Sequence, residues 1–550
     1  MLYFQRVGLL GSISLGAAAL ILLPILAVVA SVLGAAGDTW AHLLRTSLGP
    51  YIGNTALLVA GVAMGVTSIG VLSAWLVTAY RFPGRRALEW ALVLPLAMPA
   101  YVMAYAYTDW LQFTGPVQTA MRGAFGWQAR EYWFPEIRSL GGAAALLSFA
   151  FYPYVYLLAR TAFLDVSRSA LEAGRLAGYS AWGSFFRVAL PIARPAVAAG
   201  VALALMETLA DFGTVSYFAL EVFTTGIFKA WLSMGDPVAA GQLSVCLLAF
   251  VVVVLALERA SRGRAAYAST LGKAPPLQVL SGLRAAAAFF ACAMPVLLGF
   301  LLPAGLLLNL ALIDPAVRIG VPMSPRLAAL IGNSFLLAGI AAAAGVLLAT
   351  AMAYAARLSR GRASGVVAWA NRAAALGYAI PGAVIAVGVL VPLGRLDNWI
   401  AGGIESTFGM QPGLLLTGTI VALVYAYLVR FLAVALQTME AGLAKVTPRM
   451  DDAARSLGAT PAGTLARVHA PLLASSLAAA ALLLFVDVMK ELPATFALRP
   501  FNFDTLAIEA YNLARDERLA EAALPSLVVV AIGLAALLVV SKRYFQATRS

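Results

Sequence analysis

Glu172-Ala173-Gly174-Arg175-Leu176-Ala177-Gly178 is the stretch that decides the fold, because the chain contains a second version of it. The second version is Asp452-Ala453-Ala454-Arg455-Ser456-Leu457-Gly458. In both copies a proline, Pro191 or Pro471, follows the glycine at the same separation. Each copy lies in a polar stretch between two long apolar segments. This shared register indicates that the chain consists of two homologous halves.

The composition is that of a membrane protein. The 550 residues are 62% hydrophobic and 11% charged, and the mean hydropathy is +0.88, whereas soluble domains carry roughly a quarter charged residues. Apolar runs long enough to cross a bilayer, about 20 residues each, occur at about 12 places. Continuous runs exclude an outer-membrane barrel, whose strands alternate with period two. The predicted spans lie near 9–33, 52–79, 88–111, 142–163, 193–219, 239–257, 285–312, 328–356, 366–393, 413–436, 472–498 and 522–541.

Basic residues predict how the spans are oriented. If the N-terminus is cytoplasmic and sides alternate, most Lys and Arg fall in inner segments, including those around Arg160 and Arg430. This bias predicts that both termini are cytoplasmic. The formal charge of +13 then reflects topology and contact with anionic membrane lipid, and it gives no reason to expect nucleic-acid binding.

The chain divides into two halves of six spans each. Residues 1–258 form the first predicted half and 285–550 the second, and a charged, proline-containing stretch at 259–284 is the expected cytoplasmic linker. Ile52-Gly53-Asn54-Thr55 in the first half returns as Ile331-Gly332-Asn333-Ser334 in the second. Because each half has an even number of spans, the repeats have the same orientation in the membrane.

The two repeated loops, at about 165–191 and 445–471, have the composition of short helices. Alanine, leucine, arginine and an early acid favour a helix whose N-terminal end carries the negative charge. Gly178 and Gly458 are expected to end these helices. Small residues on one face and a positioned arginine suit a cytoplasmic helix that lodges in a groove of another protein.

The two loops resemble the EAA loop of permease subunits in bacterial ABC importers, which receive substrate from periplasmic binding proteins. The resemblance implies a type I ABC importer permease architecture, all-α, with about 12 transmembrane helices, in the inner membrane. It also implies that each loop couples to one of two cytoplasmic ATP-hydrolysing subunits. The motif positions are Glu172, Ala173, Gly178, Pro191, Asp452, Ala453, Gly458 and Pro471.

Within that family the chain is most similar to fused ferric-iron permeases. The similar stretches are Arg81 to Arg86, Leu94 to Val102, Glu207 to Thr214 and Lys490 to Thr495. Fused permeases for thiamine and for other small solutes look related, so these substrates remain alternatives. An ion-coupled secondary transporter with parallel repeats is the alternative from another class.

The sequence assigns no catalytic chemistry to this chain. It contains no Gly-x-x-x-x-Gly-Lys-Ser/Thr loop, so ATP and Mg are expected on separate ATPase subunits and no cofactor on this chain. His42 and His469 have no partner arrangement for catalysis or metal binding. Cys246 and Cys292 lie far apart, and we predict neither a disulfide nor a metal site.

Four acids lie in apolar spans at positions related by the repeat. Glu207 and Asp211 are spaced i and i+4 and therefore lie on one helical face, and Asp487 and Glu491 repeat this spacing in the second half, in register with the two loop motifs. Charged groups within a membrane are costly unless they are paired or wet, so we expect these acids to line a translocation pathway. The alternatives are that they form ion pairs with Lys490 or with neighbouring arginines, or that they lie near the membrane surface.

Aromatic and outer segments allow two interpretations each. Tyr101, Tyr105 and Tyr107 form one of several tyrosine clusters. Phenols bind ferric iron, but tyrosines near span ends commonly belong to interfacial belts. The longest predicted outer segment, 112–141, is the best candidate for contact with a binding protein, and interfacial packing is its alternative.

Overall fold

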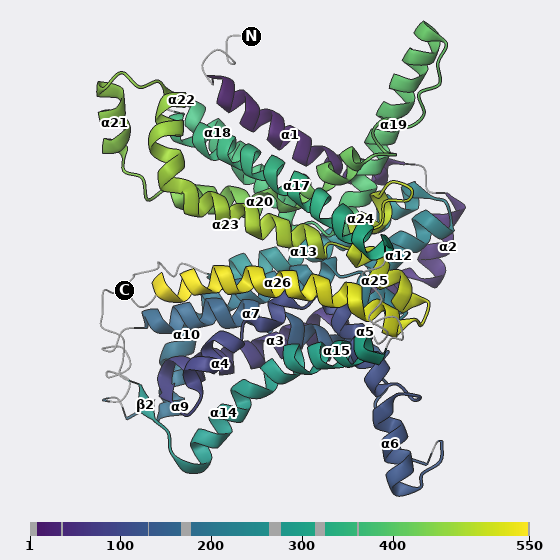
Figure 1. Cartoon of the computed structure of the whole chain (residues 1–550), viewed down its shortest axis with the longest axis vertical. Helices are drawn as coiled ribbons and strands as arrows, with labels where there is room; N and C mark the ends of the chain where they lie inside the picture. Colours follow the sequence, from purple (N-terminus) through teal and green to yellow (C-terminus); the bar gives the residue numbers. More distant parts are fainter. Residues whose placement is uncertain are drawn as a thin grey trace. The chain divides into compact units, whose positions relative to one another are not determined.

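The structure is a computed structural model that describes residues 8–34, 37–129, 131–166, 176, 178–262, 277–313, 325–359 and 362–547. The described chain is almost entirely helical (Figure 1). Its described strands are β1 (Tyr80–Arg81) and β2 (Gln278–Val279), which pair in parallel. The predicted all-helical class is therefore confirmed.

Most of the predicted spans are present as helices. The predicted span at 366–393 is wrong as a single helix, because it combines the end of Arg362–Ala375 with the start of Gly382–Phe408 across a break at Pro381. Within the described residues, 11 helices are long and apolar enough to cross a membrane, and one bent pair brings the number to 12. The bent pair joins Arg85–Ala97 to Ala100–Phe125 at an angle of 94°. The predicted span at 88–111 is thus two helical pieces at an angle, because Pro95 and Pro99 lie at the break.

Two compact units form the chain, and they do not follow the two halves of the sequence. Unit 1 contains Met1–Thr39, Ile227–Val245 and Met323–Glu509, and unit 2 contains Trp40–Gly226, Cys246–Pro322 and Ala510–Ser550. The first helix of the chain therefore belongs to the unit built mainly from the second half. The last helix belongs to the unit built mainly from the first half.

Unit 2 is organised around three helices, α3, α7 and α10, that pack against one another. Helix α14 packs against α3 and α4, and α26 packs against α15 and α5. Helix α6 projects from one end of this unit (Figure 1). The helices of unit 2 are chiefly α2 (Asp38–Thr46), α3 (Leu48–Ala79), α4 (Arg85–Ala91), α5 (Ala100–Leu111), α6 (Pro116–Phe125), α7 (Leu140–Asp165), α9 (Ala181–Ser184), α10 (Leu190–Ala210), α11 (Gly213–Tyr217), α14 (Gly282–Val296), α15 (Leu302–Ile313) and α26 (Leu519–Ala547).

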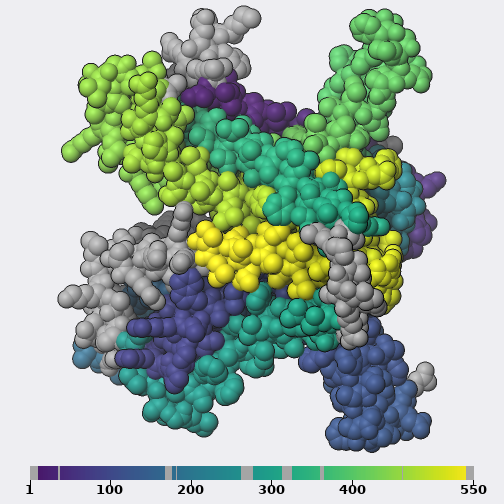
Figure 2. Space-filling model, in the orientation of Figure 1, coloured from purple at the N-terminus to yellow at the C-terminus, as the bar shows by residue number. Residues whose placement is uncertain are grey.

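Unit 1 has the corresponding core of α17, α20 and α23, and α1 packs against α17, α18 and α19. The C-terminal part of α19 forms a projecting arm (Figure 2). The helices of unit 1 are α1 (Gly8–Ala30), α17 (Pro325–Leu358), α18 (Arg362–Ala375), α19 (Gly382–Phe408), α20 (Ile420–Leu443), α21 (Pro448–Ser456), α22 (Pro461–Thr464), α23 (Ala470–Lys490) and α24 (Pro493–Leu498). Helices α12 (Phe223–Phe228), α13 (Pro237–Arg262) and α25 (Leu506–Arg515) have residues in both units.

The sequence repeat reappears in local structure. The caps Ser139 of α7 and Thr419 of α20 are equivalent positions of the repeat, and each side chain accepts a hydrogen bond from the first turn of its helix. Asn54 donates to the carbonyl of Glu221 at 2.9 Å, and Asn333 donates to that of Asp504 at 3.1 Å. The Ile-Gly-Asn repeat therefore marks equivalent helix-to-loop contacts in the two units.

Candidate functional site

The second repeated loop is built on helix α21. Pro448 occupies its first turn, where a missing N–H costs nothing, and Gly458 follows its end with φ +77°. The N–H of Gly458 donates to the carbonyl of Arg455 at 2.9 Å, and that of Ala459 donates to Ala454 at 3.0 Å. These two bonds form a Schellman motif, which requires a residue in left-handed geometry at Gly458. The glycine of the repeat therefore sets the length of α21.

Asp451 connects α21 to the ends of neighbouring helices through polar contacts. Its carboxylate lies 2.9 Å from the guanidinium of Arg357, in the last turn of α17, and 2.7 Å from Nε2 of the buried His469. Arg357 also donates to the backbone carbonyls of Leu443 at 3.0 Å and Val446 at 2.9 Å. A displacement of α21 would therefore be transmitted to α17, to the end of α20 and to the turn that precedes α23.

The motif residues Asp452 and Ala453 lie on the outer face of α21. Both are exposed, and Asp452 pairs with Arg455 at 2.8 Å on the same helix. The neighbouring Leu457 is 88% exposed. This face therefore leaves small, charged and apolar groups accessible to a partner.

In the first repeated loop, Glu172 and Ala173 lie outside the described residues. Gly178 has φ +80°, close to the value at Gly458. A π-helical turn at Phe185–Ala189 then leads into α10, and the equivalent turn at Leu465–His469 leads into α23. Pro191 and Pro471 both lie in the first turn of these long helices. The two loops therefore connect to the long helices that follow them, α10 and α23, in the same way.

Asp211 and Glu491 have the same structural position in their units. Asp211 ends α10 and accepts hydrogen bonds from the backbone N–H groups of Thr214 and Val215 at 3.1 and 3.2 Å. Glu491 ends α23 and accepts from the N–H groups of Ala494 and Thr495 at 2.8 and 2.9 Å. Each acid therefore caps a short helix, α11 or α24, that begins where the long helix stops.

The two capping acids differ in their charge environment. Glu491 is buried and lies 3.3 Å from the guanidinium of Arg430, which is itself buried in α20. Within the part of the chain that the structure describes, Asp211 has no ion pair. The charged residue that acts on it is another acid, Glu207, one turn earlier on α10. Asp487 lies one turn before Glu491 and is half-buried, as is Glu207.

The structure places two of the predicted pathway acids in each unit. Glu207 and Asp211 belong to unit 2, and Asp487 and Glu491 belong to unit 1. Their convergence on one pathway remains a prediction. Among the described residues, no group of three or more His, Cys, Asp or Glu side chains is arranged to hold a metal ion.

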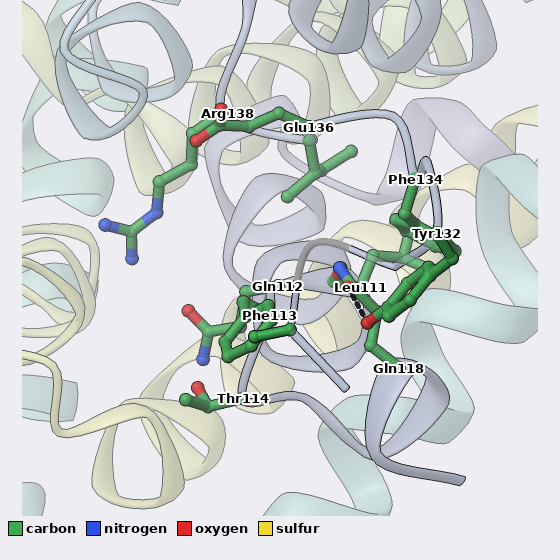
Figure 3. Close-up of a pocket in the computed structure, with 11 residues that line it drawn as sticks. Leu111, Gln112, Phe113, Thr114, Gln118, Tyr132, Phe134, Glu136 and Arg138 are labelled. Atoms are coloured by element: carbon green, nitrogen blue, oxygen red, sulfur yellow. Dashed lines mark hydrogen bonds between the residues drawn. The ribbon is translucent and has the colours of Figure 1, made fainter. Parts of the chain in front are cut away.

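An external cavity of about 590 Å³ lies between the end of α5, α6 and the loop that precedes α7 (Figure 3). Tyr132 closes one side by donating to Gln118 at 2.7 Å. Arg138 lies on another side, and its guanidinium pairs with Glu517 at 2.8 Å and stacks 4.8 Å from the ring centre of Tyr217. Partial burial lowers the pKa of Arg138, but the hydrogen bond with Glu517 and the interactions with Tyr217 and the Glu517 charge together raise that pKa above its ordinary value, so this wall of the cavity stays charged.

Several residues of these sites were not singled out by sequence reasoning. They are Arg357, Asp451 and His469 beside α21, and Arg430 beside Glu491. Arg430 was assigned to an inner segment, but it lies in the middle of α20. The available signal was a basic residue inside a predicted apolar span, which generally has an acidic partner in the same membrane protein.

Comparison with known proteins identifies the family. Residues 66–262 match the model of the binding-protein-dependent transport system inner membrane component. The chain is 26% identical over 491 residues to an Fe(3+)-transport system permease protein of Haemophilus influenzae, an alignment that covers 89% of this chain and 88% of the relative. Residues 66–262 belong to the binding-protein-dependent transport permease family, and the similarity to the Fe(3+) relative extends over most of the chain.

Two further relatives of this permease align with only part of it. A sulfate transport system permease protein of Escherichia coli is 28% identical over 259 residues, which are 45% of this chain and 90% of the relative. A molybdenum transport system permease protein of the same species is 27% identical over 206 residues, 36% of this chain and 87% of the relative. The permease is thus a multi-pass inner-membrane transport subunit whose length is matched by the Fe(3+) relative.

Proposed function

We propose that this permease is the membrane subunit of an ATP-driven importer that moves ferric iron from a periplasmic binding protein to the cytoplasm. The observation that carries the substrate assignment is the alignment of both sequence halves with an Fe(3+) permease. The sulfate and molybdenum relatives align over 45% and 36% of the chain. Hard oxygen donors such as carboxylates, which a trivalent iron prefers, are also present in the spans.

The coupling role rests on the two repeated loops. Each loop docks on one of two ATPase copies, which bind ATP and Mg, and the outer face of α21 supplies the contact in unit 1. The residues assigned to coupling are Glu172, Ala173, Gly178, Pro191, Asp452, Ala453, Gly458 and Pro471. Closure of the ATPases would move α21, and the contacts of Asp451 would pass that movement to α17 and α23.

Substrate delivery is assigned to the loop that precedes α7 in unit 2. This loop carries exposed aromatic and charged groups, including Trp133, Glu131 and Glu136. With both termini cytoplasmic, it is periplasmic and accessible to a binding protein. Transport then proceeds by alternating access, inward-open at rest and outward-open when ATP brings the ATPases together.

We assign Glu207, Asp211, Asp487 and Glu491 to the translocation pathway. Their support is the recurrence of paired acids at the ends of α10 and α23. Brief contact with each acid suits transport better than stable metal storage, since tight binding would hinder release.

Uptake by membrane vesicles tests this function. Vesicles that contain the permease, its ATPase and its binding protein are given radioactive ferric iron, sulfate, molybdate or thiamine, with and without ATP. ATP-dependent uptake of iron alone is expected. Uptake that needs an ion gradient and ignores ATP would support a secondary transporter, and uptake of another solute alone would overturn the iron assignment.

A further inference from the structure

The equivalent acids Asp211 and Glu491 have diverged in what surrounds them. In unit 1, Arg430 neutralises Glu491. Gly382 makes room for that pair, because a Cβ there would collide with the guanidinium of Arg430 and lie 2.9 Å from the carboxylate of Glu491. Helices α7 and α20 begin at equivalent positions of the repeat, so the position of Arg430 in α20 corresponds to Ala150 in α7. Unit 2 therefore has a methyl group where unit 1 has a guanidinium.

A group of tyrosines in unit 2 packs beside α11, the short helix that Asp211 caps. Tyr105 is 1% exposed, and its ring contacts that of Tyr217 on α11. Its ring is 4.7 Å from that of Tyr217 and 5.8 Å from that of Tyr101. Tyr511 belongs to the same group, because its hydroxyl is 2.8 Å from that of Ser216 on α11, the helix that Asp211 caps.

The hydroxyl of Tyr105 is buried and has no hydrogen-bond partner among the described residues. A buried polar atom without a partner destabilises a fold, and a phenylalanine would supply the same ring without that cost. Asp211 is a half-buried carboxylate without an ion pair in the described chain, and Glu207 lies one turn earlier on α10. Neither Asp211 nor Tyr105 contacts a basic side chain in that part of the chain, and the guanidinium of Arg138 contacts Tyr217 of the same tyrosine group.

We infer that Asp211 and Tyr105 form a transient site for a hard, highly charged cation in unit 2. Unit 1 has no counterpart of this site, because Arg430 occupies the equivalent position beside Glu491. Carboxylate and phenol oxygens are hard ligands of the kind that trivalent iron prefers. An oxyanion would instead need basic or N–H donors, which Arg430 could offer only by leaving Glu491. Two protein ligands hold a cation weakly, which suits its passage. This inference rests on the proposed import of ferric iron.

The test replaces single hydroxyls in the complete transporter. Tyr105→Phe removes the phenol oxygen of the inferred site. Tyr152→Phe is the matched control, because Tyr152 is also fully buried in unit 2 and its hydroxyl also has no hydrogen-bond partner in the described chain. Vesicle uptake of radioactive ferric iron is measured for both, together with ATP hydrolysis stimulated by the iron-loaded binding protein.

Tyr105→Phe is expected to lower iron uptake by roughly tenfold, as the loss of one metal ligand contact would, whereas Tyr152→Phe stays near the unmodified level. Asp211→Asn, which keeps an oxygen to cap α11, should lower uptake similarly. Equal uptake by the two tyrosine variants would overturn the inference, as would full activity of Asp211→Asn. If the unmodified transporter imports sulfate or molybdate and not iron, the proposed function fails first. If it imports iron and Tyr105→Phe does so equally well, only the transient site is wrong.

Discussion

The guanidinium of Arg357 in α17 lies 2.9 Å from the carboxylate of Asp451 in α21. This pair joins the helix that carries the second repeated motif to a core helix of unit 1. The more exposed Asp452, which occupies the motif position, forms its ion pair with Arg455 within α21 itself. Adjacent acids of α21 therefore differ in their contacts: Asp451 attaches the helix to α17, and Asp452 stays on the exposed face that we propose docks on the ATPase.

Removing the attachment should impair coupling. Arg357→Ala deletes the ion pair with Asp451 and two hydrogen bonds to carbonyls of the α20 exit, and each charge-assisted bond is worth about 1.5–3 kcal/mol. We expect transport to fall while ATP hydrolysis continues, because α21 can then move without α17. Arg518→Ala is the control, since its exposed pair with Glu521 lies outside the proposed docking face and contributes about 0–1 kcal/mol. Equal transport by the two variants would contradict the attachment role.

Gly458, which ends α21, and its repeat equivalent Gly178 should tolerate asparagine better than valine, because both have left-handed backbone. A side chain at Gly178 or Gly458 meets no atom within 4 Å, so the cost is that of left-handed backbone, about 1–2 kcal/mol for most residues. Gly458→Val should weaken ATPase co-purification and transport, and Gly458→Asn should retain most of both. Normal co-purification and transport by the valine variants at both positions would refute the docking assignment.

The buried pair of unit 1 should respond differently from the capping acid of unit 2. Glu491→Gln removes the carboxylate charge beside the buried Arg430, and breaking a buried ion pair costs about 3–5 kcal/mol, so the melting temperature of the purified permease should drop. Arg430→Met combined with Glu491→Gln should recover much of that loss. Asp211→Asn strands no cation and should melt near the unmodified protein. A double variant no more stable than Glu491→Gln would rule out the pairing.

Labelling with a membrane-impermeant maleimide tests the orientation. In a version without Cys246 and Cys292, Trp133→Cys and Leu457→Cys each supply one thiol at a site that is 85% or 88% exposed. Intact spheroplasts should label Trp133→Cys, and Leu457→Cys should react only after the membrane is opened. The reverse pattern would place the termini in the periplasm.

The sequence was sufficient for the helical class, the number of spans and the repeat, because long apolar runs and glycine-terminated helices are local signals. Gly458 and Pro471 show this, since each is found at the helix boundary that its chemistry predicts. The break between α4 and α5 was less visible, because apolar residues continue through the bend.

The charge partners could not be predicted, because they join residues far apart in the chain. Arg430 and Glu491 are 61 positions apart, and Arg357 and Asp451 are 94 apart. Nothing in the spacing of either residue specifies the other. The acids at the ends of α10 and α23 looked equivalent in sequence, and only the neighbouring helices reveal that one is neutralised by an arginine.

The first helix, α1, packs in the unit built mainly from the second half of the sequence, and the last helix, α26, packs in the other unit. This arrangement has a consequence for biosynthesis. Helix α1 leaves the ribosome first, yet its packing partners α17, α18 and α19 are translated only after the whole first half. Unit 2 in turn lacks α26 until the last residues are made. Neither unit can complete its core during synthesis of the first half, so α1 must wait in lipid for its partners. A chain severed between α13 and α14 would yield two incomplete fragments, each dependent on the other for folding and for escape from membrane proteolysis.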